Sequence, residues 1–146
     1  MKLKMKLFFA LIAVLCVSCN NNHLVKSWKL DNMDFTEIYK EVPESELEMM
    51  KKDIEENVSK TKGKIIFVFD KENKLEMTTP NFDGTNNIVK GTWKLSEDKK
   101  VLTTEFKEES DAGPTKQDFT VHELSGDKLV IEPKGEKIKL IFVPKK

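Results

Sequence analysis

Short segments rich in apolar, β-branched and aromatic residues recur along most of this chain, and each is bounded by residues that favour turns. Eight segments of this kind are found at residues 24–30, 65–69, 74–79, 88–95, 100–106, 116–124, 128–132 and 137–143. Turn formers separate them, such as Gly113 and Pro114 in the longest gap. Regular short strands with turn signals between them are typical of a β-sandwich or a β-barrel.

The order of the segments favours a barrel over a sandwich. Sequential hairpins predict an antiparallel up-and-down meander, and about eight strands close a barrel just wide enough for side chains or one small ligand. Closure leaves no strand edge unpaired. The fold class is therefore predicted to be mainly β, an antiparallel up-and-down barrel of about eight strands with one α-helix between the first and second strands.

The predicted helix lies in the long interval between the first two strands. Apolar residues recur at helical spacing from Leu47 to Val58, Pro43 suits the first turn, and Gly63 is a natural end. The apolar stripe is narrow, so the helix is expected to lie across one end of the barrel. There it would act either as a lid or as a fixed plug.

The first 18 residues have the three parts of a secretory signal. Lysines at positions 2, 4 and 6 precede an uncharged apolar run of 11 residues at 7–17, and Ser18 is the small residue before Cys19. The run is too short to cross a bilayer, which takes about 20 apolar residues. Residues 1–18 are therefore predicted to be removed on export.

The end of this leader, Leu15-Cys16-Val17-Ser18-Cys19, resembles the lipobox of bacterial lipoproteins, with Cys16 where the pattern prefers Leu. The resemblance implies that Cys19 is acylated and begins the mature protein, with residues 19–23 as the lipidated cysteine and tether. Two or three acyl chains at one site anchor a protein stably, whereas one chain holds only marginally. The alternative is that both cysteines are apolar leader residues and cleavage occurs elsewhere.

The tether gives the expected location. Asn20 stands where lipoproteins kept in the inner membrane carry Asp, and the acidic residues typical of surface-displayed Bacteroidetes lipoproteins do not follow Cys19. The protein is therefore expected to be lipid-anchored in the outer membrane and to face the periplasm. Surface display stays open as the alternative.

Composition excludes several classes of function for the exported domain, residues 24–146. The leader takes three of the 25 basic residues and none of the 25 acidic residues, so the mature chain has a net charge of −3. All basic residues are lysines, and no basic patch is present, so nucleic acid is rejected as a partner. Loss of Cys16 and acylation of Cys19 would leave no thiol for a disulfide, a metal site or a nucleophile.

The chain resembles the lipocalin-like lipoproteins of Bacteroidetes. The resemblance rests on Trp28 in the first strand, a following helix, a central Gly-Thr-Trp-Lys-Leu strand at residues 91–95, and two late strands at 119–124 and 127–131. It covers nearly all of residues 24–143. Lipocalins usually carry Gly two residues before the first-strand Trp, where this chain has Lys26. The family implies a barrel and an envelope location, but no established ligand or reaction.

Aromatic residues on the predicted strands are the candidate ligand-lining residues. They are Trp28, Phe67, Phe69, Trp93, Phe106, Phe119 and Phe142. Two interpretations stay open, because these rings either contact an apolar ligand or fill the barrel, as side chains do in most small barrels.

No catalytic, cofactor or metal site is predicted. His23 and His122 are far apart, whereas a metal site needs three or four converging ligands. No Gly-x-Ser-x-Gly turn accompanies them, so the chain is interpreted as a protein without enzymatic activity. The leading hypothesis is an envelope lipoprotein that binds a small apolar or amphipathic molecule. The alternative is a packed barrel that serves as a protein-interaction or structural accessory module.

Overall fold

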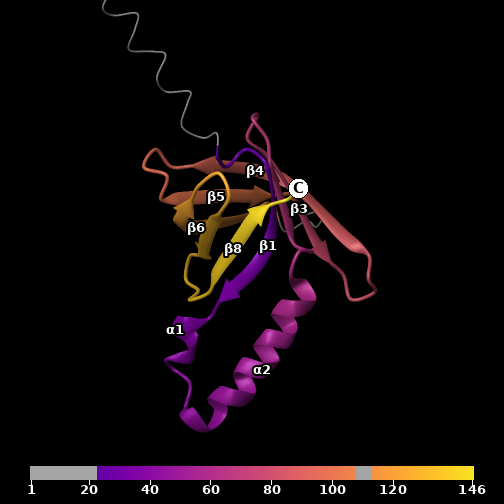
Figure 1. Ribbon diagram of the computed structural model, residues 1–146. Helices are drawn as coiled ribbons and strands as arrows, with labels where there is room; N and C mark the ends of the chain where they lie inside the picture. Colours follow the sequence, from indigo (N-terminus) through magenta and orange to yellow (C-terminus); the bar gives the residue numbers. More distant parts are fainter. Residues whose placement is uncertain (1–22, 108–112) are drawn as a thin grey trace, which may run out of the picture.

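The computed structural model describes residues 23–107 and 113–146, so the predicted signal, residues 1–18, and Cys19 lie outside the described residues. Eight antiparallel strands form a closed barrel in which each strand pairs with its neighbours in sequence and the last pairs with the first. Figure 1 shows the barrel with two helices extending from one end. The strands are β1 (Ser27–Asp34), β2 (Ile66–Phe69), β3 (Lys74–Pro80), β4 (Asn86–Leu95), β5 (Val101–Phe106), β6 (Thr115–Leu124), β7 (Leu129–Pro133) and β8 (Lys139–Pro144).

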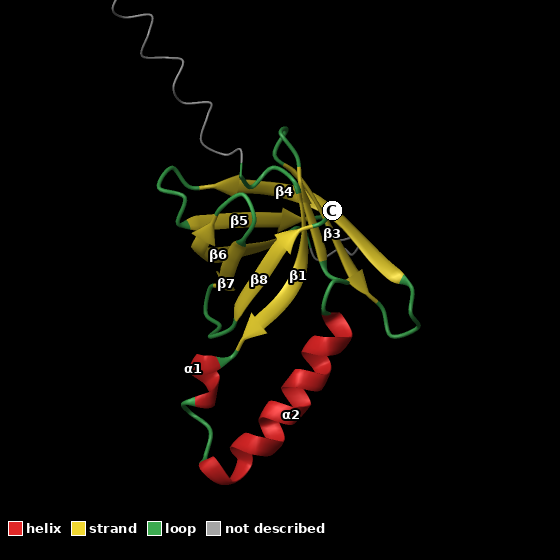
Figure 2. Cartoon of the chain, in the orientation of Figure 1, coloured by secondary structure: helices red, strands yellow, loops and turns green. Residues whose placement is uncertain are grey.

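The up-and-down barrel with a helix between the first two strands is confirmed. The helical segment holds α1 (Thr36–Tyr39) and α2 (Glu44–Thr61), and α1 was not predicted (Figure 2). The predicted end of the long helix at Gly63 is correct, because Gly63 follows α2 with a φ of 73°, which glycine adopts without strain.

The first strand differs most from its prediction at residues 24–30. Strand β1 begins at Ser27 and continues to Asp34, because its second half pairs with β8, Met33 opposite Leu140 and Asp34 opposite Lys139. The polar residues that follow Leu30 do not have the apolar pattern of a strand, so the sequence did not predict this extension. A register shift at Asp31 lets the strand bend around the barrel.

Inward side chains from all eight strands form the core. The fully buried residues include Trp28, Leu30, Leu102, Leu129 and Phe142. At Gly91 the chains of β4 and β5 approach so closely that a Cβ would lie 2.1 Å from the backbone oxygen of Glu105. Glycine is therefore required there, and this explains the Gly of the Gly-Thr-Trp-Lys-Leu motif.

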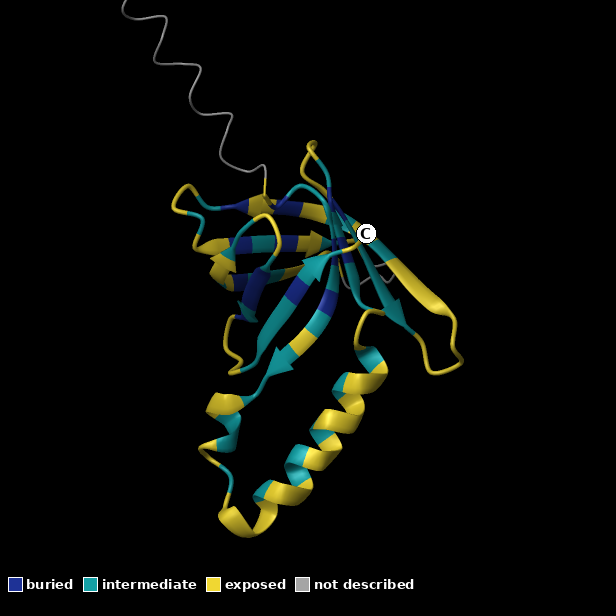
Figure 3. Cartoon of the chain, in the orientation of Figure 1, coloured by how far each residue is buried: buried dark blue, intermediate teal, exposed yellow. Residues whose placement is uncertain are grey.

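Helix α2 is not a plug. None of its residues is buried, and Figure 3 shows it with exposed and half-buried residues along its whole length. It contacts the barrel at β1. The end of the helical segment is tied to β1 by the amide of Gly63, which donates to the carbonyl of Leu30 at 2.7 Å. None of the helices in the described part of the chain combines the length and apolarity needed to cross a membrane.

Candidate functional site

The barrel has two unlike ends. The closed end carries the tight turns between β2 and β3, β4 and β5, and β6 and β7, and the buried side chain of Leu24 lies there beneath Trp28. The other end, called here the open end, carries the helical segment and the longer loops. A ligand that enters the barrel would therefore enter at the open end.

Six of the seven candidate aromatic residues lie inside the barrel and pack against each other or the core. Phe67 stacks on Phe142 with ring centroids 5.1 Å apart, and Phe69 meets Trp93 edge to face at 5.7 Å. Such ring pairs stabilise a core beyond the area they bury. The six are buried at 7% exposure or less: Trp28, Phe67, Phe69, Trp93, Phe119 and Phe142. In this structure these rings fill the interior of the barrel.

The seventh residue, Phe106, has a different environment. It is half-buried at the end of β5, and it lines a groove of about 830 Å³ at the open end, called here the mouth groove. Met77 and Val89 lie opposite each other on β3 and β4 and line the same groove. Sequence analysis missed both, although their alternation with Leu75 and Gly91 along two strands is the signal that places them inside the barrel.

The mouth groove is apolar with positive charge. Ile88 and Lys90 alternate with Val89 along β4 and therefore line the outer rim of the groove. Lys90 and Lys107 are its charged members. None of the described residues that line it is acidic. An anion with an apolar body matches this combination of groups.

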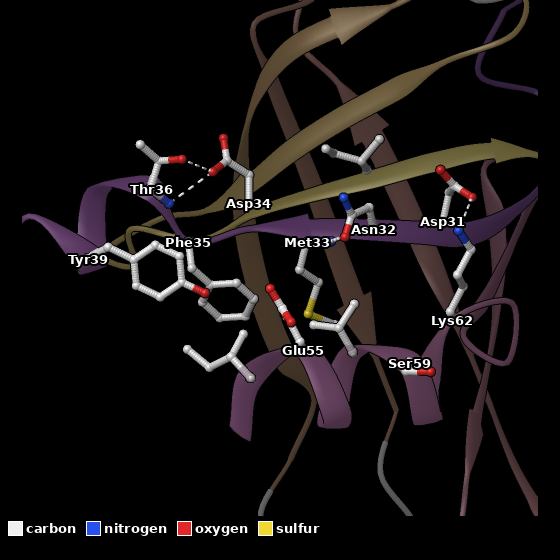
Figure 4. Close-up of a pocket in the computed structure, with 13 residues that line it drawn as sticks. Asp31, Asn32, Met33, Asp34, Phe35, Thr36, Tyr39, Glu55, Ser59 and Lys62 are labelled. Atoms are coloured by element: carbon white, nitrogen blue, oxygen red, sulfur yellow. Dashed lines mark hydrogen bonds and ion pairs between the residues drawn. The ribbon is translucent and has the colours of Figure 1, made fainter. Parts of the chain in front are cut away.

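A second groove, of about 630 Å³, lies between β1, α1 and α2 and is called here the helix groove (Figure 4). Its apolar lining includes Met33, Ile54 and Val58. In Figure 4 the rings of Phe35 and Tyr39 lie together at one end, 6.3 Å apart by their centroids. Sequence analysis did not predict this groove.

The helix groove carries the opposite charge to the mouth groove. Asp31, Asp34 and Glu55 line it against the single lysine Lys62, which pairs with Asp31 at 3.1 Å. Burial raises the pKa of the Tyr39 hydroxyl, and the negative charges of Glu55 and Asp34 raise it further. Two carboxylates therefore act on the Tyr39 ring, while the ammonium groups of Lys139 and Lys40 act on Asp34.

Neither groove has the groups of a metal centre. In residues 23–107 and 113–146 no three His, Cys, Asp or Glu side chains gather closely enough to hold a metal ion. His122 contacts Glu132 at 2.7 Å across β6 and β7.

This architecture is that of a lipocalin-like barrel. A family model described as a lipocalin-like domain matches residues 24–131, and the chain belongs to that family. A crystal structure of a lipocalin-like protein from Bacteroides uniformis ATCC 8492 has the same fold, with a TM-score of 0.56 and 17% sequence identity over 84% of this chain and 99% of that one. An uncharacterized protein from Bacteroides eggerthii DSM 20697 aligns with a TM-score of 0.49 and 16% identity, over 83% of this chain and 98% of that one. Curated proteins give no match.

Proposed function

We propose that this protein is an envelope-anchored lipoprotein whose barrel binds a small amphipathic anion in the mouth groove. The observation that carries the proposal is the position of Phe106, inside the open end of the barrel and only half-buried. With Met77 and Val89 it offers a half-buried apolar surface at the edge of the packed core. The packed core lies beneath this groove. A ligand in the groove would therefore not need to displace the core side chains.

The size and chemistry of the mouth groove suit such a ligand. Its volume of about 830 Å³ lies within the range of small-molecule sites, about 300 to 1,000 Å³. The apolar body of the ligand would lie against Phe106, Met77 and Val89. Its anionic head would lie within reach of Lys90 and Lys107, and surface attractions of this kind are modest, so most of the affinity would come from apolar burial.

The proposed anchor at Cys19 gives the barrel an orientation. The five peptide steps from Cys19 to Leu24 span at most about 18 Å. Because Leu24 lies at the closed end, that end would face the membrane, and the mouth groove would open away from it. Ligand would then enter from the aqueous side of the envelope, which for an outer-membrane lipoprotein facing inward is the periplasm.

Binding of octanoate to the full-length protein in zwitterionic nanodiscs tests the mouth groove. We expect saturable binding by calorimetry, about tenfold weaker after Phe106→Ala, which corresponds to roughly 1.4 kcal/mol of lost apolar contact. Lys107→Met should weaken binding about two- to fivefold. The matched control is Lys94→Met, which removes an exposed lysine of β4 outside the groove and should leave binding unchanged. No binding, or an equal loss in the control, would refute the proposal.

The alternative function is a packed barrel that binds a partner protein. It is favoured by the β3–β4 hairpin, where Phe82 at the tip is fully exposed and Ile88 is 56% exposed. Hydrogen bonds between Asn81 and Thr85 hold the turn that presents this ring. Crosslinking in intact cells through a photoreactive residue at Phe82 would capture one defined envelope protein if this function is correct.

A further inference from the structure

We propose that the helix groove is a second binding site and that it takes a small amphipathic cation, an ammonium group carried on an alkyl chain. The proposal is independent of the mouth groove, because the two grooves share no lining residue and carry opposite charge. It identifies a ligand class for the space between the barrel and α2, which the lipocalin-like fold alone does not account for.

The helical segment contacts the barrel at both ends of the helix groove. At one end Lys62 pairs with Asp31 and the amide of Gly63 binds the carbonyl of Leu30. At the other end Lys137, just before β8, pairs with Glu41 ahead of α2. The space between these attachments therefore does not depend on a ligand to form it, and a preformed site loses less free energy on binding.

Apolar side chains of α2 face this space without being covered. Ile54 and Val58 are half-buried, and they line the groove opposite Met33 of β1. These three side chains would contact an alkyl chain. A site of about 630 Å³ is large enough for a ligand of this size.

The aromatic end of the groove has the groups that bind an ammonium ion. In Figure 4 the side chain of Glu55 rises from α2 toward the rings of Phe35 and Tyr39. Its carboxylate makes no hydrogen bond or ion pair within the described segments of the chain. Aromatic faces next to a carboxylate attract organic cations through the ring quadrupole and through charge.

One lysine ammonium group already lies over the Tyr39 ring. The Nζ atom of Lys51 lies 5.9 Å from the centroid of the Tyr39 ring, at the distance typical of a cation–π contact. Lys51 is not itself a lining residue, and its only ion pair within residues 23–107 and 113–146 is a long one of 3.7 Å to Glu48. Lys51 therefore shows that the Tyr39 ring accepts an ammonium group, and we expect it to compete with a ligand cation for this ring.

The test follows Tyr39, which is the only tyrosine of the chain and gives a site-specific NMR signal. Hexyltrimethylammonium is titrated into the full-length protein, labelled at tyrosine and held in zwitterionic nanodiscs. We expect a saturable shift of the Tyr39 ring signals, weakened by salt. Hexanoate at the same concentrations should leave these signals in place.

Three variants separate this site from a general effect of charge. Glu55→Gln should weaken binding about two- to fivefold, and Lys51→Met should strengthen it by a similar factor because it removes the competing ammonium. Glu56→Gln is the matched control, since it removes the neighbouring carboxylate, which pairs with Lys60 and does not line the groove. Equal losses for Glu55→Gln and Glu56→Gln, weaker binding to Lys51→Met, or an unmoved Tyr39 signal would each overturn the proposal.

Discussion

The indole N–H of Trp28 donates a hydrogen bond of 2.9 Å to the backbone carbonyl of Leu24, and neither residue is exposed to solvent. This bond holds the segment that precedes β1 inside the closed end of the barrel. Leu24 was predicted to be the first residue of the first strand. It instead precedes β1, and its buried side chain covers the closed end of the barrel.

Trp28→Phe should destabilise the protein by about 1–3 kcal/mol, because the buried carbonyl of Leu24 keeps only the amide of Lys26 as a donor and the smaller ring leaves a cavity in the core. Urea unfolding measures the difference. Trp93→Phe is the matched control, since its indole N–H makes a longer bond of 3.2 Å to Asp70 in a partly buried position, and its loss should be smaller. A larger loss for Trp93→Phe would contradict this account.

Gly91→Ala should cost about 3 kcal/mol, because the new Cβ would meet backbone atoms of β5 that cannot move without opening the barrel. Gly126→Ala should stay within about 0.5 kcal/mol, since a Cβ there meets its nearest atom at 3.8 Å. Thermal unfolding followed by circular dichroism distinguishes the two. Equal midpoints would show that the approach of β4 and β5 is not tight.

Asp98 should add to stability only when it is ionised. The Ser96 hydroxyl, and after it the amide of Lys100, donate to its carboxylate and hold its pKa below the ordinary value. The contribution is therefore present above about pH 3.9 and disappears as the pH falls through the lowered pKa. Melting curves of Asp98→Asn and wild type should differ at pH 7 and converge in acid.

The control for that series is Glu97→Gln, which removes an adjacent carboxylate that makes no hydrogen bond or ion pair within the described residues. Its melting temperature should follow the wild type across the same pH range. If the difference in melting temperature between Glu97→Gln and the wild type changed with pH as much as it does for Asp98→Asn, the effect would be due to net charge and not to the hydrogen bonds of the turn.

Cys19→Ser should abolish acylation of the full-length protein in its own host, because the sequence predicts this thiol as the acceptor. Metabolic labelling with an alkyne fatty acid and intact mass measure the result. Cys16→Ser should still be labelled, since residue 16 is predicted to be removed with the leader. Labelled Cys19→Ser protein would place the anchor elsewhere.

The strands that could be predicted best are those whose turns are marked locally. The prediction for β3 is within one residue at its end because Asn73 and Pro80 mark its limits, and the prediction for β5 is within one residue at its start because the turn ending at Lys99 precedes it. The extension of β1 to Asp34 could not be predicted, since its partner β8 lies more than a hundred residues away.

The grooves were harder to predict than the strands. Phe106 is among the predicted candidates, but no local sequence signal distinguishes it from Phe119, which is buried. The two differ in position along the barrel axis, because Phe106 lies at the end of β5 that faces the open end. The helix groove depends on how far α2 stands from β1. That spacing is set by contacts such as Lys62 with Asp31 and Lys137 with Glu41, which no periodicity reveals.

The pairing of β1 with β8, Trp28 opposite Pro144, has a consequence for how the chain folds. Hairpins from β2 to β7 can form as soon as their residues are available, but the ring closes only when β8 arrives. Contacts between such distant residues form late and slowly. If the chain is exported from its N-terminus, as its leader predicts, β1 would therefore lack one of its partners until β8 has been translocated. During that interval the exposed strand would be the natural target of an envelope chaperone.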